Sequence, residues 1–391
     1  MRTSDPLPPA SVPERARDPH RWFAQRRAAG PVFLLDEPGC AEPTAVIVDG
    51  NEVVRALSDD AYSVAGNVSW GRTRPTIPLQ IDPPEHERYR RYLDPLLRRA
   101  EMSLLMPRIE QHARELLDRI EARGRCEFVT DFARPLPVTI FLTLLGVPTD
   151  DVAFLLEFKD SVTRPHGDTV EARRALQEHW AQRAETYFAE RLDAARRHGN
   201  DGLIGRLLVA EVDGVRLTDD ELLDVCYQLA LGGLDTVTAT MGLIWAYLAT
   251  HDEHRRQLAT DPGTARLAVE ELLRWATPVT GCKRRAVRDV DVAGCPISGG
   301  QVVMFGIASA NSDPALFDDP DTVDFTRRGN RHWAFGGGIH RCLGSHLARL
   351  ELVAAVQAWH ARIPEYRLAE PDLDYTDGNV IRAVTRLELV W

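Results

Sequence analysis

The chain has 391 residues, a net charge of −11 and a composition of 44% hydrophobic and 27% charged residues. This length can bury a large core, and the negative balance argues against nucleic acid or an anionic membrane surface as a partner. The longest apolar run, at 138–147, is too short and too interrupted to span a bilayer. The six cysteines lack the spacing of a disulfide framework or of a paired metal site. We therefore expect a soluble, cytoplasmic, monomeric protein.

The first residues differ in composition from the rest of the chain. Prolines at positions 6, 8, 9 and 13 predict a loose N-terminal arm over residues 1–20. This segment has no apolar core, so it is not expected to act as a signal peptide. Beyond it, the chain shows neither a linker composition nor an internal repeat. Residues 21–391 are therefore expected to form a single domain.

Helical patterns dominate the remaining chain, and strand-like segments are short. Strands are expected at 31–35 and 45–48, before a helix that starts with Asp82-Pro83-Pro84-Glu85. Further helices are expected at 105–122, 135–145, 150–163 and 170–198. Thr218 and Glu221 form a capping-box pattern that opens a long helix to about 251. The last expected elements are helices at 264–276 and 345–362 and strands at 290–292, 302–305 and 384–390. This balance predicts a mainly α fold with small β-sheets.

The long helix after Thr218 contains two adjacent glycines, Gly232 and Gly233. Each costs about 1 kcal/mol relative to alanine inside a helix, so a reason for them is expected. One reason is close packing of another helix, and the other is close approach of a planar cofactor and a small ligand. Asp235 and Thr236 follow the glycines, and a Thr hydroxyl can bond the carbonyl four residues back and open the helix locally.

The most informative segment of the chain is Phe335-Gly336-Gly337-Gly338-Ile339-His340-Arg341-Cys342-Leu343-Gly344. Its glycines allow a flat, bulky group to lie close to the backbone. Cys342 directly precedes a helical pattern, and the free N–H groups at a helix start stabilise a thiolate. Taken alone, the segment fits either a thiolate metal ligand or a glycine turn before a core helix with an incidental Cys.

The spacing Phe335-x-x-Gly338-x-His340-x-Cys342-x-Gly344 resembles the haem-thiolate loop of the cytochrome P450 family. The resemblance implies the cytochrome P450 fold, in which haem b lies between a long distal helix and a proximal Cys loop. It implies Cys342 as the metal ligand, because a thiolate donates electron density to haem iron. The cofactor-binding residues implied in the Cys loop and the distal helix are Phe335, Gly336, His340, Cys342, Gly344, Gly232 and Gly233.

The distal segment Gly232-Gly233-Leu234-Asp235-Thr236-Val237 is similar to the same family, and especially to its camphor-hydroxylase type. The resemblance implies Asp235 and Thr236 as the catalytic residues that deliver protons during oxygen activation.

Basic partners are required for the two haem propionates. The pattern Asp82-Pro83-Pro84-x-His86-x-x-x-Arg90 resembles the family's propionate-binding helix and implies His86 and Arg90 as two partners. Arg284 is implied as a third, although Lys283 and Arg285 flank it and the register could slip by one residue. His340 is implied as a propionate partner and not as a second iron ligand.

Two further groups of residues complete the resemblance. Glu271-x-x-Arg274 matches the family's Glu-x-x-Arg element and implies a structural ion pair buried behind the haem. The implied substrate contacts are Gln228, Leu231, Val279, Thr280, Val380 and Ile381. Gln228 lies one turn before Gly232, so it is expected to point toward the distal side, where a buried amide needs hydrogen-bond partners. It bonds either to protein and water or to an oxygenated substrate.

These features predict a haem-thiolate monooxygenase that inserts one atom of O2 into a small to medium hydrophobic substrate, such as a terpenoid-like natural product. Electrons are expected from NAD(P)H through a ferredoxin reductase and an acidic ferredoxin. The residues expected to dock the ferredoxin are Arg88, Arg91, Arg98, Arg99, Arg341 and Arg349. The alternatives are an atypical oxidation such as C–C cleavage or coupling, a haem-binding sensor, and a cysteine hydrolase that uses Cys342 with His340.

Overall fold

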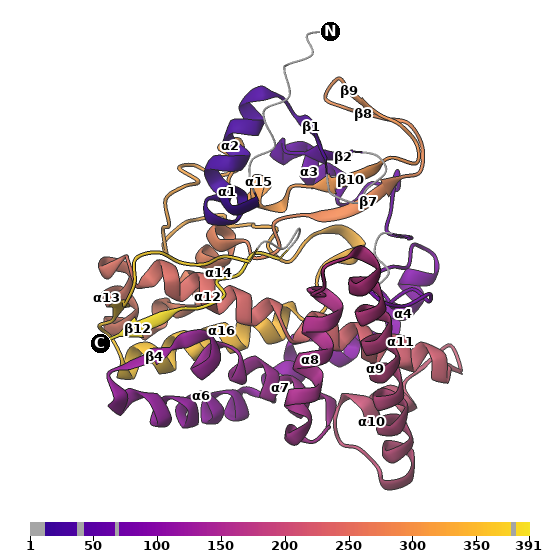
Figure 1. Cartoon of the computed structure of the whole chain (residues 1–391), viewed down its shortest axis with the longest axis horizontal. Helices are drawn as coiled ribbons and strands as arrows, with labels where there is room; N and C mark the ends of the chain where they lie inside the picture. Colours follow the sequence, from indigo (N-terminus) through magenta and orange to yellow (C-terminus); the bar gives the residue numbers. More distant parts are fainter. Residues whose placement is uncertain (1–11, 37–42, 67–69, 377–380) are drawn as a thin grey trace.

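The computed structural model describes residues 12–36, 43–66, 70–376 and 381–391. As predicted, the described chain is mainly helical, and its larger sheet lies at one side of the helical body (Figure 1). The helices are α1 (Val12–Arg17), α2 (Pro19–Ala29), α3 (Gly50–Ala56), α4 (Glu85–Leu97), α5 (Arg99–Ser103), α6 (Met106–Ile120), α7 (Pro135–Leu145), α8 (Val152–Thr163), α9 (Val170–His198), α10 (Leu203–Val209), α11 (Asp219–Gly233), α12 (Thr236–Leu248), α13 (Asp252–Thr260), α14 (Ala265–Ala276), α15 (Ile307–Asn311) and α16 (Ser345–Arg362). Shorter helical turns are η1 (Glu121–Arg123), η2 (Val129–Ala133), η3 (Thr149–Asp151), η4 (Pro262–Thr264) and η5 (Gly338–His340).

The strands form one larger sheet and three small ones. They are β1 (Val32–Leu35), β2 (Thr44–Ile47), β3 (Tyr62–Ser63), β4 (Arg125–Glu127), β5 (Glu211–Val212), β6 (Val215–Arg216), β7 (Cys282–Ala286), β8 (Val290–Val292), β9 (Cys295–Ile297), β10 (Val302–Phe305), β11 (Arg367–Leu368) and β12 (Glu388–Val390). The larger sheet has the order β1-β2-β10-β7-β3, with β2 and β10 parallel and the other neighbours antiparallel. Its two faces belong to separate hydrophobic clusters, so the sheet is covered on both sides.

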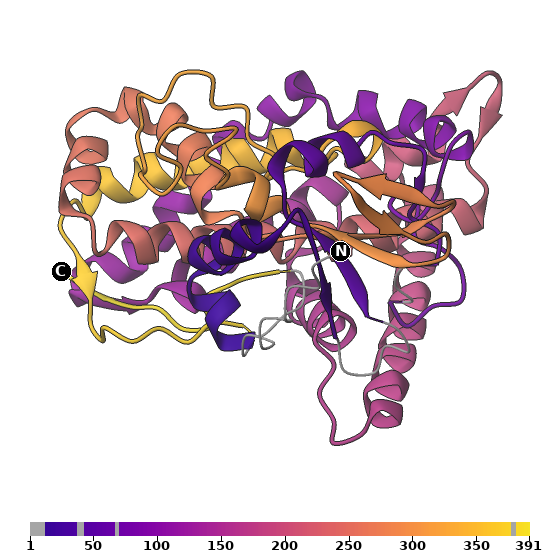
Figure 2. The same cartoon turned by 90° about the horizontal axis from the view of Figure 1, so that it is seen from above.

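The helical body is built around α12 and α16, and α16 contacts α6, α13 and α14 as well (Figure 2). Trp245 of α12 and Trp359 of α16 are fully buried at the centre, 5.9 Å apart between ring centroids. Phe128 stacks on Trp245 at 4.8 Å. Burial of such large rings supplies much of the hydrophobic stabilisation of the core.

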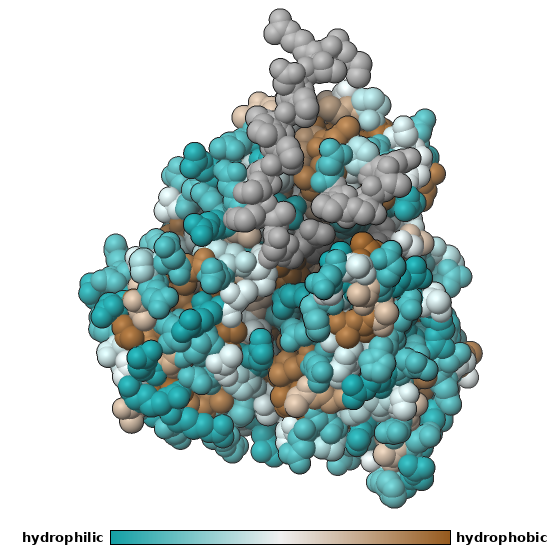
Figure 3. All heavy atoms as spheres, viewed as in Figure 1, coloured by the Kyte–Doolittle hydropathy of each residue, from teal (hydrophilic) through white to brown (hydrophobic). Residues whose placement is uncertain are grey.

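The long apolar helix is a core element of this body. The stretch Asp219–Leu248 is the one helical segment among the described residues that is long and apolar enough to cross a membrane, and 78% of its apolar window is buried. Hydrophilic side chains cover most of the face of the molecule shown in Figure 3, and hydrophobic ones occur there in small groups.

The expectation of a loose arm over residues 1–20 is wrong for the part that the structure describes. Residues 12–17 form α1, and α2 begins at Pro19. The buried guanidinium of Arg382 donates to the carbonyls of Ala16 (2.5 Å) and Arg17 (3.2 Å). These bonds satisfy carbonyls that a short helix leaves unpaired at its C-terminus, so a distant side chain holds α1 in place. Residues 1–11 lie outside the described residues, and the single domain over 21–391 stays a prediction.

Most helix boundaries agree with the predictions, and the exceptions have local causes. The capping box between Thr218 and Glu221 is confirmed. Asp82 does not cap α4, because its carboxylate accepts hydrogen bonds from Ser63 and from the N–H of Val64 instead. The helix expected to run to about 251 is interrupted between Gly233 and Thr236. The strand expected at 384–390 is limited to β12.

Candidate haem site

The Cys loop, residues 335–344, contains the helical turn η5 and leads into α16. The N–H of Cys342 donates to the carbonyl of Phe335 at 2.9 Å and closes the loop. Gly336 and Gly338 have φ angles of +68° and +60°, a conformation that disfavours side chains. A Cβ at Gly338 would also stand 2.1 Å from the carbonyl oxygen of Leu57. Glycine is therefore required here by backbone geometry and by the close approach of the segment after α3.

Cys342 is surrounded by protein but keeps an accessible surface. Burial raises the pKa of its thiol, while the N–H of Gly344 and the charges of Arg341, Arg90 and Arg349 act in the opposite direction. Cys342 is nevertheless an exposed residue, so a ligand can approach its side chain. The helix start alone therefore does not produce the thiolate that the sequence suggested, because α16 begins only at Ser345 and desolvation is the larger effect. A bound metal cation would supply the missing stabilisation.

The buried His86 meets the half-buried His340 of the Cys loop. The rings of His86 and His340 lie 4.3 Å apart between centroids. Both ring nitrogens of His86 and Nε2 of His340 are buried without a hydrogen-bond partner among the described residues. Burial, and then the positive charge of Arg284, lowers the pKa of His340 to about 3. Buried unpartnered nitrogens are costly, so this cluster is suited to an acceptor supplied by a ligand.

The strand β7 places Arg284 and its two basic neighbours on opposite faces. Arg284 pairs with Val303 of β10, and its charge acts on His340. Its neighbour Arg285 is exposed and donates to the carbonyl of Gly300 at 2.5 Å. Side chains alternate along a strand, so Lys283 and Arg285 point to the opposite face from Arg284. Arg284 is therefore the member of this run that lies on the side of the histidine cluster.

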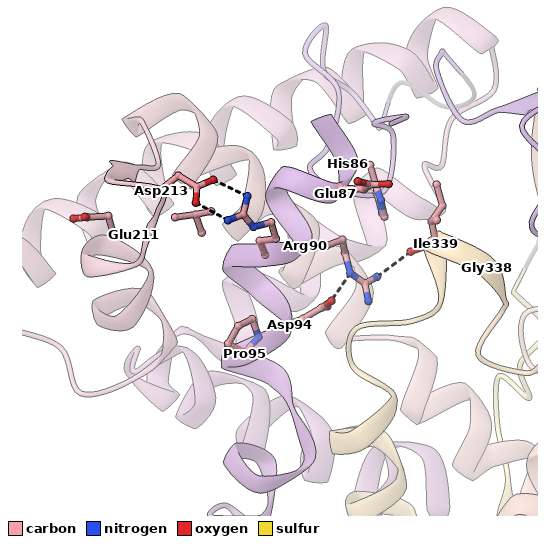
Figure 4. A pocket seen from close by; sticks show the side chains of 11 residues that line it. His86, Glu87, Arg90, Asp94, Pro95, Glu211, Asp213, Gly338 and Ile339 are labelled. Carbon is pink, nitrogen blue, oxygen red and sulfur yellow. Dashed lines mark hydrogen bonds and ion pairs between the residues drawn. The ribbon is translucent and has the colours of Figure 1, made fainter. Parts of the chain in front are cut away.

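Arg90 lies close to the histidines but supports the Cys loop itself. Its Nη1 donates to the carbonyls of Arg341 (2.9 Å) and Ile339 (3.3 Å), and its Nε donates to Asp94 (2.8 Å). Figure 4 shows the bonds of Arg90 to the Ile339 carbonyl and to Asp94, in an open hollow of about 770 Å³ that His86 and Arg90 line. The structure thus gives Arg90 a loop-holding position, and its role as a propionate partner stays a prediction.

The two glycines of α11 have different surroundings. Gly232 is exposed, and a Cβ built on it would meet only Nε2 of Gln228 at 3.8 Å. A Cβ on Gly233 would stand 2.6 Å from the ring of Phe141 in α7. Helix packing therefore requires a glycine at position 233, and its expected place at the cofactor stays a prediction. Gly232 alone leaves the open surface that a planar group needs.

Thr236 makes the expected hydrogen bond, and Asp235 makes two ion pairs, while the catalytic role of both residues stays a prediction. The hydroxyl of Thr236 donates to the carbonyl of Gly232 at 3.0 Å, where the helix is interrupted. Asp235 is buried and ion-paired with Lys159 (3.0 Å) and Arg164 (2.5 Å) of the α8 segment. The sequence interpretation missed these two partners. The sequence offered one sign of these partners, because Lys159 is a lone lysine in a mostly apolar predicted helix. The structure buries Lys159 almost completely, as such a position requires a charged partner.

The predicted substrate contacts are only partly brought together. Gln228 is half-buried, and its Oε1 is buried without a partner among the described residues. Val279 pairs with Ile381 in an isolated antiparallel bridge, and Thr280 follows in the same segment. Leu231 is buried in the main core. Val380 lies outside the described residues.

Glu271 and Arg274 form the buried ion pair expected from their spacing. Arg274 donates to both oxygens of Glu271 at 2.9 and 2.7 Å, and the two side chains are 0% and 1% exposed. Arg274 also bonds the carbonyls of Asn311, Pro320 and Thr322. Arg327, which the sequence interpretation did not include, donates to Glu271 at 3.0 Å. The cluster fastens the segment before the Cys loop to α14.

The residues present fit a haem. The exposed Cys342 would suit the metal of such a group, and the open space beside Gly232 would suit its ring. The three unpartnered imidazole nitrogens of His86 and His340 would suit its carboxylates. No group of His, Cys, Asp and Glu side chains with the arrangement of a metal-ion site occurs among the described residues.

Comparisons with known proteins agree with this interpretation. A family model described as cytochrome P450 matches residues 264–358. A probable cytochrome P450 127A1 of Sinorhizobium fredii is 32% identical over 98% of this chain and 92% of its own length. The mycinamicin IV hydroxylase/epoxidase of Micromonospora griseorubida is 35% identical over 94% of each chain. The crystal structure of the myxobacterial cytochrome P450 CYP267B1 in complex with myristic acid matches with a TM-score of 0.90 and 31% identity, over 98% of this chain and 99% of that chain.

Proposed function

Because this chain belongs to the cytochrome P450 family, whose members are haem b monooxygenases, we propose that it inserts one oxygen atom from O2 into a small to medium hydrophobic molecule, with Cys342 as the iron ligand. The single observation that carries the assignment of Cys342 is its exposed position inside a loop closed by the bond to Phe335. When bound, the haem supplies the oxygen activation and the electron transfer. The chain supplies the ligand, the proton source and the orientation of the substrate.

Three side chains are proposed to hold the propionates. His86 and His340 offer unpartnered nitrogens, and Arg284 adds the positive charge on the same side. Carboxylates at this place would satisfy the nitrogens and would raise the low pKa of His340, because an anion favours the protonated imidazole. Gly232 is proposed to allow the approach of the ring and of O2 on the distal side.

The hydroxyl of Thr236 is proposed to position a water molecule that would deliver the proton consumed in oxygen reduction. Its own hydrogen donates to the carbonyl of Gly232, so its lone pairs can accept a hydrogen bond from that water. Asp235 is proposed to act behind it as a fixed carboxylate, since Lys159 and Arg164 restrict it to one position. This role differs from that of a freely moving proton carrier.

Thr236→Ala is expected to leave haem binding intact and to divert electrons from product to hydrogen peroxide, because the hydroxyl that positions the proton is lost. The measurement is the ratio of product and peroxide formed to NAD(P)H consumed. Thr240→Ala is the matched control, since Thr240 makes the same bond to the carbonyl four residues back, at 2.7 Å to Thr236. Coupling at the wild-type level in Thr236→Ala would remove Thr236 from the proton pathway.

Gln228 is proposed to recognise an oxygen function on an otherwise apolar, terpenoid-like substrate. Its amide lies next to the open side of Gly232, and its Oε1 has no partner among the described residues. A hydrogen bond to substrate would relieve the cost of the buried amide. The names of relatives, including a pentalenic acid synthase and a vitamin D(3) 25-hydroxylase, support oxidation of this general class.

Gln228→Leu is expected to weaken binding of a hydroxylated terpenoid about fivefold, the loss of one net hydrogen bond of about 1 kcal/mol. Binding of the matching hydrocarbon should remain equal or improve. The measurement is the dissociation constant of each ligand from the spin-state shift of the haem. Gln177→Leu serves as the control, because the amide of Gln177 is already bonded to the carbonyl of Val162 at 2.7 Å. Equal changes for both ligands in Gln228→Leu would contradict the role.

Electrons are proposed to come from NAD(P)H through a ferredoxin reductase and a ferredoxin in the cytoplasm. Four of the six arginines expected at the docking face are ion-paired within the chain: Arg88 with Glu221, Arg91 with Asp213, Arg98 with Glu101, and Arg349 with Glu270. The exposed residues proposed to meet an acidic partner are therefore Arg99 and Arg341.

The absorption spectrum of the reduced, CO-bound protein tests the haem-thiolate assignment. A red-shifted Soret band is expected, whereas a cysteine hydrolase would bind no haem. Turnover with a ferredoxin system and product analysis then separate the monooxygenase from a haem sensor, which would show the band without product. The same analysis would reveal C–C cleavage or coupling.

A further inference from the structure

A second acidic residue of α14, Glu270, connects the two ends of the Cys loop. Its Oε1 accepts from Nε of Arg349 at 2.6 Å, and its Oε2 accepts from Nη2 of Arg349 at 2.9 Å. Its Oε2 also lies 3.0 Å from Nε2 of His332. His332 comes before the loop and Arg349 comes after it. One carboxylate therefore bridges both sides of the segment that carries Cys342.

The hydrogen bonds define the protonation states in this group. The N–H of Ala334 donates to Nδ1 of His332 at 3.2 Å, so Nδ1 is an acceptor and Nε2 carries the hydrogen that Glu270 accepts. Burial would raise the pKa of Glu270, but the bonds from His332 and Arg349 lower it to about 2. Glu270 is thus held in its negative form beside the guanidinium of Arg349.

Arg349 in turn touches the loop. Its guanidinium lies over the ring of Phe335, 4.3 Å from the centroid, and the carbonyl of Phe335 accepts the N–H of Cys342. The charge of Arg349 also acts on the Cys342 thiol, in the direction that lowers its pKa. The guanidinium is therefore close enough for its electrostatic field to reach the sulfur. The side chains of Arg349 and Glu270 are each only about a quarter exposed, so water screens this field weakly.

We propose that Glu270 is a positioning residue that sets the reduction potential of the haem by holding Arg349 against Phe335 and compensating its charge beside Cys342. This inference rests on the proposed role of Cys342 as the iron ligand. An uncompensated positive charge near the ligand favours the reduced haem, and an uncompensated negative charge favours the oxidised haem. The ion pair keeps the local field close to neutral. Removing either partner should therefore shift the potential, and in opposite directions.

The test measures the one-electron reduction potential of the substrate-free haem protein by spectroelectrochemistry. Glu270→Gln is expected to shift the potential upward, and Arg349→Gln to shift it downward. The double variant is expected to return close to the wild type, because both charges are then absent. The reduction potential of Arg349→Lys should stay near that of the wild type, because this variant keeps the positive charge. Its potential can still be measured if the Gln variants fold poorly. Glu178→Gln, in the exposed pair with Arg174 on α9, is the control that should leave the potential unchanged.

Different outcomes would contradict the charge compensation by Glu270 and the assignment of Cys342 as the iron ligand. Unchanged potentials in both single variants, or shifts in the same direction, would overturn the charge compensation while the red-shifted CO band persists. Same-direction shifts would instead indicate general loosening of the loop. Absence of the red-shifted band in the wild type would contradict Cys342 as the ligand before any variant is compared.

Discussion

Cys342→Ser is expected to abolish the red-shifted Soret band of the reduced, CO-bound protein and all monooxygenase turnover. A serine hydroxyl does not ionise near neutral pH, so it cannot donate to the iron as a thiolate does. The loop should keep its shape, because it is closed by the backbone bond from residue 342 to the Phe335 carbonyl and by the glycines at 336 and 338. The measurement is the CO difference spectrum, with haem content determined on the same sample.

Cys282→Ser is the matched control for this experiment. Cys282 lies in β7, and burial raises the pKa of its thiol, as it does for Cys342. The control variant should retain the band. If Cys342→Ser kept the red-shifted band, another residue would have to be the ligand.

Arg274→Met is expected to lower the free energy of unfolding by about 3–5 kcal/mol, the range found when one partner of a buried ion pair is removed. The substitution leaves the Glu271 carboxylate without its bidentate partner, and the carbonyls of Asn311, Pro320 and Thr322 lose the hydrogen bonds from Arg274. Because these carbonyls belong to the segment that leads to the Cys loop, haem incorporation should fall with stability. The measurements are the urea midpoint and the haem content per mole of protein.

Arg266→Met tests whether position on α14 alone explains such a loss, since Arg266 is an exposed residue of the same helix. Arg266→Met should change the free energy of unfolding by no more than about 0.5 kcal/mol. Arg274→Lys keeps the charge but loses the planar fork, so an intermediate loss is expected. A stable, haem-loaded Arg274→Met variant would show that the other donors to Glu271, namely Arg327, Asn330 and the N–H of Asp324, suffice to hold it.

Several features of this protein follow from residues that are neighbours in the chain. The capping box of Thr218 and Glu221 is complete within four residues. The bond from Thr236 to Gly232 spans one helical turn, and so does the pair of Glu271 and Arg274. Local backbone geometry brings such groups together wherever the helix forms. The closely spaced glycines and Cys of the loop are equally local, which is why the haem-thiolate resemblance was recognisable.

Other features depend on elements that meet only in the folded chain. Asp235 finds Lys159 across 76 residues, and Glu270 finds Arg349 across 79 residues. Gly233 is explained by the ring of Phe141, and the C-terminal end of α1 by Arg382. In each case the residue type allows several partners, and the choice among them is made by which helices pack together. The sequence by itself therefore determined the helices, the loop and the family, whereas only the tertiary structure decided which charges are compensated and which side chains face the site.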